Sequence, residues 1–130
     1  MSSWSTAQLD DIAAEQWPYW APIRHHFGIT TFGINAWRGA DGDEVIKRHD
    51  ESDSRSPELY LVLSGSATFT IGEDDVEARE GTLVYVSDPT VERVAFAKAD
   101  GTVVLSIGAG AAGEGFGHSG WDANYLESAP

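Results

Sequence analysis

Cysteine is absent from the 130 residues of this chain, and basic residues are few. Without cysteine the chain can form no disulfide bond, no thiolate nucleophile and no cysteine-ligated zinc site. Eight lysine and arginine residues against 21 aspartate and glutamate residues give a formal net charge of −13. An acidic surface repels phosphate backbones and anionic lipid head groups, so we expect neither a nucleic-acid partner nor a membrane partner.

Long apolar runs are also lacking. No stretch reaches the roughly 18 apolar residues that a membrane-spanning helix requires. The polar N-terminus has no basic region followed by an apolar one, as a secretory signal would have. These absences predict a cytoplasmic protein. The length predicts one domain with a proper core, and a hydrophobic content of 42% argues against global disorder.

From Gly28 onward, short segments of alternating polar and apolar residues are separated by turn residues. They predict strands at residues 29–37, 45–51, 58–63, 67–71, 76–78, 83–86, 91–97 and 102–107. Ser64-Gly65 is predicted to form a hairpin between two of these strands. Because no long helical pattern interrupts them, the segments indicate an antiparallel sandwich or barrel.

The two ends of the chain have a different character. Residues 5–8 resemble a helix capping box, and the apolar spacing that follows, through Ala13, predicts a short N-terminal helix. Prolines at 18 and 22 stop it, and the aromatic residues Trp17, Tyr19 and Trp20 are expected to be extended. The C-terminal segment is rich in Gly and Ala and is predicted to be a flexible tail. We therefore divide the chain into 1–27, 28–108 and 109–130.

The most specific pattern runs from His49 to Gly65, with the sequence HDESDSRSPELYLVLSG. It resembles the first motif of the cupin family, in which two histidines, a glutamate and a glycine follow at set intervals. Glu58 and Gly65 have the family spacing, and His49 corresponds to the first histidine. Glu51 stands in place of the second histidine, and the spacer from it to Glu58 is longer than in the family.

A second stretch, GTLVYVSDPTVERVAF, begins at Gly81 and resembles the second cupin motif. The position of its histidine falls on Glu92, or on Arg93 if the strand contains a one-residue bulge. The resemblance implies a single-domain, all-β cupin: an antiparallel β-barrel, also called a double-stranded β-helix or jelly roll, with a short N-terminal helix. It also implies a homodimer.

Side chains alternate between the two faces of a strand, so inward residues can be grouped. If Glu58 points inward, Tyr60 and Val62 do too. If His49 points inward, Lys47 and Glu51 accompany it. If Glu92 points inward, Arg93 points outward and would form a surface salt bridge. Buried carboxylates need a compensating cation or an altered protonation state, and Lys47 is one candidate for the cation.

Three interpretations of this residue set remain open. In the first, His49, Glu58 and Tyr60 bind a small organic molecule inside the barrel, by acid/base chemistry without a metal or by simple binding. In the second, the ligands His49, Glu51, Glu58 and Glu92 hold one divalent ion, for which manganese, iron or magnesium is favoured and zinc is not excluded, in an enzyme such as an oxygenase or isomerase. In the third, the chain is a non-catalytic dimeric scaffold.

Overall fold

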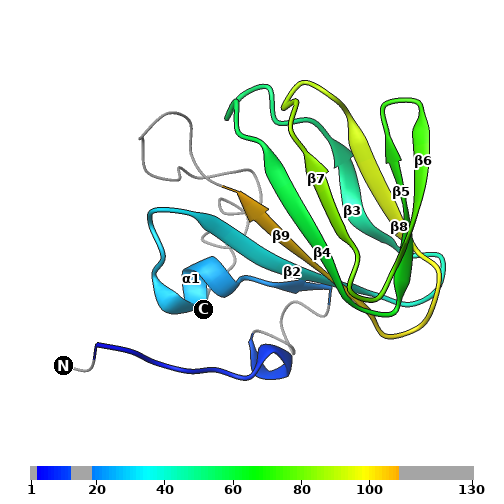
Figure 1. Cartoon of the computed structure of the whole chain (residues 1–130). Coiled ribbons are helices and arrows are strands. Elements are labelled where there is room, and N and C mark those ends of the chain that lie inside the picture. Colours follow the sequence, from blue (N-terminus) through cyan, green and yellow to red (C-terminus); the bar gives the residue numbers. More distant parts are fainter. Residues whose placement is uncertain (1–2, 13–18, 109–130) are drawn as a thin grey trace.

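The computed structural model describes residues 3–12 and 19–108, which form two antiparallel sheets facing each other (Figure 1). The five-stranded sheet has the order β1 (Trp20–Ala21), β2 (Gly33–Gly39), β9 (Thr102–Gly108), β4 (Glu58–Ser64), β7 (Leu83–Val86). The four-stranded sheet has the order β3 (Glu44–His49), β8 (Arg93–Ala97), β5 (Ser66–Ile71), β6 (Asp74–Arg79).

The all-β jelly-roll prediction is confirmed, and each strand predicted from the period-two pattern is present. The barrel itself needs correction. Within residues 3–12 and 19–108, every strand pair lies inside one sheet, so the sheets form an open sandwich instead of a closed barrel. The core lies between them. Tyr60 and Val62 of β4 point inward as predicted, and the Tyr60 ring packs 5.4 Å from the ring of Phe69 on β5.

Gly65 lies where the chain passes from one sheet to the other. The predicted hairpin is wrong, because β4 pairs with β7 and β9 whereas β5 pairs with β6 and β8. Gly65 has φ +73°, and a Cβ there would lie 2.3 Å from Thr102 Oγ1 and 2.7 Å from Thr102 Cα. Only glycine fits both the left-handed backbone and the close approach of β9. This requirement explains why a glycine stands at this position of the motif.

The N-terminal segment packs on the outer face of the five-stranded sheet. A single 3-10 turn, η1 (Leu9–Asp11), replaces the predicted capped helix, and Gln8 makes no side-chain cap bond. A second short helix, α1 (Ile23–Phe27), follows Pro22 and was not predicted. Trp20 is buried and stacks on Trp37 with ring centroids 5.8 Å apart. Ala13, Trp17 and the C-terminal tail lie outside the described residues. Within the described residues, no helix is long and apolar enough to cross a membrane.

Candidate functional site

The end of β3 and the start of β4 bring three of the predicted site residues together. Between the paired residues Ile46 and His49, β3 advances by three residues while its partner strand β8 advances by two, so β3 contains a β-bulge. This bulge turns His49 toward Glu58 and leaves Lys47 outside, where its ammonium lies 3.6 Å from Glu44. The expectation that Lys47 accompanies His49 into the interior is therefore wrong.

His49 lies between two carboxylates. Its Nε2 is 3.0 Å from Oε1 of Glu51 and 3.4 Å from Oε1 of Glu58, and its Nδ1 is 2.6 Å from the carbonyl oxygen of Lys47. Burial lowers the pKa of His49, but the hydrogen bonds to Glu51 and Glu58 outweigh it and raise the pKa to about 10. At neutral pH the ring is an imidazolium that donates from both nitrogens.

Glu51 is held by the loop that precedes β4. Its Oε2 accepts a hydrogen bond from the Ser54 hydroxyl at 2.9 Å, while its Oε1 accepts from His49. Burial raises the pKa of Glu51, but these two hydrogen bonds outweigh it, and the pKa lies below its ordinary value. Glu51 is therefore a carboxylate fixed at both oxygens.

Arg93 enters the site from the four-stranded sheet, where it is the register partner of His49. The side chain is fully buried, and Nη1 lies 3.1 Å from Oε1 of Glu58. Its Nε donates to the carbonyl of Val91 at 3.0 Å and its Nη2 to that of Asp88 at 3.3 Å. Of the two alternatives for the second motif, the structure has the one with Arg93 inside.

Glu92, the residue just before β8, points to the face opposite that of Arg93. Its carboxylate is exposed and accepts from Arg48 at 2.8 Å. The expectation of an inward Glu92 and an outward Arg93 is wrong, because a one-residue change of register exchanges the two faces of a strand. The exposed Phe96, an odd number of positions from Arg93, is consistent with this register.

Tyr60 completes the contacts of Glu58. Its hydroxyl donates to Oε1 of Glu58, the same oxygen that Arg93 and His49 approach. Burial, the negative charge of Glu58 and this hydrogen bond raise the pKa of Tyr60 above its ordinary value, so the phenol remains a donor. Among the described residues, none donates a hydrogen bond to the other oxygen of Glu58.

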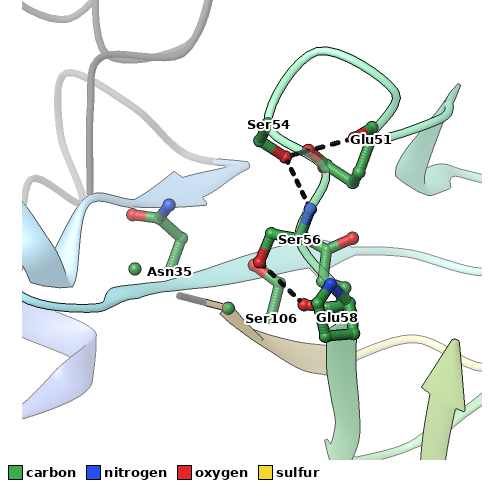
Figure 2. Close-up of a pocket in the computed structure, with 9 residues that line it drawn as sticks. Asn35, Glu51, Ser54, Ser56, Glu58 and Ser106 are labelled. Atoms are coloured by element: carbon green, nitrogen blue, oxygen red, sulfur yellow. Dashed lines mark hydrogen bonds between the residues drawn. The ribbon is translucent and has the colours of Figure 1, made fainter. Parts of the chain in front are cut away.

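A small pocket of about 40 Å³ opens beside this group (Figure 2). It is lined by Gly33, Asn35, Glu51, Ser54, Ser56, Pro57, Glu58, Ser106 and Gly108. In Figure 2 the loop that carries Glu51 and Ser54 lies beside the start of β4, which carries Glu58. A volume of this size holds a few water molecules or one small polar group, not a whole drug-sized ligand.

Two strand residues of this pocket were not predicted from the sequence. Asn35 on β2 and Ser106 on β9 are register partners, and both interrupt otherwise apolar segments at inward positions. The Ser106 hydroxyl accepts from Trp37 Nε1 at 3.0 Å. A polar residue at an inward position of an apolar strand is the signal that could have found them. Tyr60, His49 and Arg93 are not among the residues that line the pocket.

The geometry also permits a metal interpretation. One ligand atom each from His49, Glu51 and Glu58 lies within 4.8 Å of the others, which is close enough to surround one ion. Glu92 does not belong to this group. The fit is poor in one respect, because the buried guanidinium of Arg93 already occupies a position next to the shared carboxylate, Glu58.

No protein-family model and no curated protein matches this sequence. Solved structures do match in fold. A cupin protein from Bacteroides fragilis has a TM-score of 0.69 at 19% identity, covering 92% of this chain and 93% of that chain. An RmlC-like cupin from Desulfovibrio desulfuricans has a TM-score of 0.52 at 24% identity, with 61% and 72% covered. A salicylate 1,2-dioxygenase from Pseudaminobacter salicylatoxidans has a TM-score of 0.51 at 14% identity, with 61% and 21% covered.

Sequence identities at this level establish the fold alone, and the chemistry has to be argued from the residues of the site. The sandwich of two antiparallel sheets agrees in overall fold with these neighbours. The chain has the cupin fold.

Proposed function

We propose that the protein binds a small polar organic molecule at this pocket, and that Glu58 exchanges a proton with it. One observation carries the proposal. Glu58 lines the pocket with one oxygen fixed by Tyr60, Arg93 and His49, while its second oxygen accepts no hydrogen bond from the described residues. A carboxylate held in place with one open oxygen is suited to accept a hydrogen bond or a proton from a ligand.

The surrounding residues have separate roles in this proposal. Tyr60 and Arg93 contact Glu58 and orient it. The sequence had suggested that Tyr60 contacts the ligand, but in this proposal Tyr60 acts through Glu58. His49 is close to Glu58, and its imidazolium holds the same carboxylate oxygen that Arg93 approaches. Glu51 holds His49 in position for this contact.

The chemistry of the pocket favours a ligand with hydrogen-bond donors. Two carboxylates and the side chains of Asn35, Ser54 and Ser106 line it, and no lining residue is a cation. A net charge of −13 further disfavours anions. The ligand class that fits is a neutral or cationic molecule with hydroxyl or amino groups, one of which enters the pocket.

Thermal-shift screening of small sugars, diols, amines and short carboxylic acids tests this proposal. A compound that binds only the folded state raises the melting temperature by mass action. We expect hits among hydroxyl and amino compounds, and we expect Glu58→Gln to lose the shift. Glu92→Gln is the matched control, because Glu92 lies outside the site and the shift should remain. Equal shifts in both variants would place the binding site elsewhere.

A metal-dependent enzyme is the second candidate, favoured by the proximity of His49, Glu51 and Glu58. One divalent ion, such as manganese, iron or magnesium, would then polarise a substrate, as in an oxygenase or isomerase. Its test is the melting temperature in the presence of each ion. A rise that Glu58→Gln abolishes would support this candidate over the first.

The scaffold interpretation is favoured by an apolar strip on the outer face of β4 and β7. Leu83 and Tyr85 of this strip are 62% and 63% exposed, and they pair with Leu61 and Leu59. Exposed apolar patches of this kind mark interaction surfaces, and a homodimer is the partner we propose. Light scattering after gel filtration tests it. Leu83→Lys should give a monomer, whereas Phe32→Lys, at another exposed apolar site, should not.

A further inference from the structure

We infer that Arg93 is the built-in cation of this site, that it takes the place of a metal ion, and that it positions Glu58. The inference deepens the proposed function, since Arg93 would act through Glu58. It concerns a residue that the sequence left as one of two alternatives for the histidine position of the second motif, and that the structure places at the centre of the charged group.

Position is the first support. Arg93 is the register partner of His49, so both come from the same strand pair, and both approach Glu58 from across the sandwich. The histidine position of the second family motif falls on Glu92 or Arg93, and in this chain Arg93 is the one that points inward while Glu92 is exposed. A cation is thus supplied by the polypeptide at the point where the family motif would supply a ligand for one.

Competition for the same oxygen is the second support. Oε1 of Glu58 already accepts from Tyr60 and from Arg93. An ion bound by Glu58 would lie close to the guanidinium, and an arginine side chain keeps its charge in proteins. Because Arg93 is completely buried, solvent and salt would screen this repulsion only weakly. The guanidinium therefore opposes a second cation at Glu58.

Rigidity is the third support. The guanidinium is anchored by the carbonyl oxygens of Val91 and Asp88 as well as by Glu58. Three acceptors around one planar group fix its orientation, and Nη1 of the fixed guanidinium in turn holds Oε1 of the carboxylate. A lysine has one flexible ammonium and cannot satisfy these three acceptors in the same geometry. Arg93 is thus a positioning residue for Glu58.

Titration with manganese chloride and zinc chloride tests the inference without any organic ligand. In wild-type protein we expect no rise in melting temperature that depends on Glu58. Arg93→His removes the cation and places an imidazole beside His49 and Glu58, and we expect it to gain a rise of several degrees at saturating metal. The double variant Arg93→His/Glu58→Gln should lose that rise.

Arg48→His is the matched control, because it adds a histidine next to His49 in sequence but on the exposed side. It should gain no Glu58-dependent metal binding. A wild-type melting rise that Glu58→Gln removes would overturn the inference, and so would an Arg93→His protein that folds without gaining metal binding. If Arg93→His does not fold, manganese titration of wild type against Glu58→Gln, followed by electron paramagnetic resonance, decides the question. Failure of the ligand screen with the expected metal results would reject the proposed function and leave this inference standing.

Discussion

Arg93 and Glu58 form an ion pair that joins the two sheets, with Nη1 on β8 lying 3.1 Å from Oε1 on β4. Arg93 has no exposed surface, so its desolvation is compensated by this carboxylate and by two backbone carbonyls. The pair therefore contributes to the site and to the fold together.

Removing one partner of this pair should destabilise the protein strongly. Glu58→Leu leaves the Arg93 charge buried beside an apolar side chain, and we expect the free energy of unfolding to fall by about 3–5 kcal/mol. Urea denaturation measures it. The double variant Glu58→Leu/Arg93→Met should recover much of the loss, because no unpaired charge remains. Additive losses in the double variant would show that the two residues are not coupled.

The pKa of His49 predicts a loss of stability at alkaline pH. The pKa is raised in the folded state to about 10 from an ordinary 6.5, so protonation favours folding. This contribution is complete below about pH 6.5 and is lost as the pH rises toward about 10. Denaturation midpoints should fall over this window in wild type. His49→Gln should show a flatter profile there, and His26→Gln, at an exposed position of α1, should behave like wild type.

Glu51 gives the opposite dependence at acid pH. Its pKa is lowered in the folded state, mainly because the hydrogen bonds from His49 and Ser54 outweigh burial. Its contribution is present above the ordinary pKa of a glutamate and is lost as the pH falls through the folded value. We expect Glu51→Gln to reduce the loss of stability on acidification. An unchanged acid profile in that variant would contradict the assigned contacts.

Gly65 should tolerate no side chain. Its positive φ costs about 1–2 kcal/mol for alanine, and the Cβ would also lie 2.7 Å from the backbone of Thr102. We expect Gly65→Ala to lower the free energy of unfolding by about 2–5 kcal/mol when overpacking is added. Gly81→Ala isolates the backbone effect, because φ is +86° there and nothing lies within 4 Å of the added Cβ. Similar losses in both variants would exclude the steric contribution.

Tyr60→Phe should separate positioning from packing. The ring and its contact with Phe69 remain, while Glu58 loses one of its three donors. We expect a loss of about 1.5–3 kcal/mol in stability, typical of a hydrogen bond to a charged group. Binding of any compound found by the screen should weaken because Glu58 is held less firmly. Unchanged binding would remove Tyr60 from the account, and Tyr85→Phe, on the outer face, serves as the control.

The regular parts of the fold were predictable because strands of a sandwich alternate between core and solvent. This alternation correctly placed Glu58, Tyr60 and Val62 on the inner face. The bulge in β3 has no sequence signal of its own, yet it decides which of two neighbouring residues points inward. For that reason Lys47 was expected beside His49 in the interior, whereas it lies outside. The second motif left Glu92 and Arg93 as alternatives for the inward position, and the structure has Arg93 inside and Glu92 exposed.

Long-range pairing was the other feature that local patterns could not supply. Ser64-Gly65 looks like a hairpin turn, and only the pairing of β4 with β9 and of β5 with β8 reveals it as a crossing between sheets. The pocket residues Asn35 and Ser106 come together through the same kind of pairing, between β2 and β9, which are distant in the sequence.

The most direct test of the central claim, that Arg93 completes the Glu58 site in place of a metal ion, is the metal content of untagged protein purified without chelator. Elemental analysis by mass spectrometry would measure the number of manganese, iron, zinc and copper ions per chain. We expect the sum to be far below one ion per chain in wild type and in Glu58→Gln alike. About one ion per chain in wild type, lost in Glu58→Gln and retained in Glu92→Gln, would contradict the account.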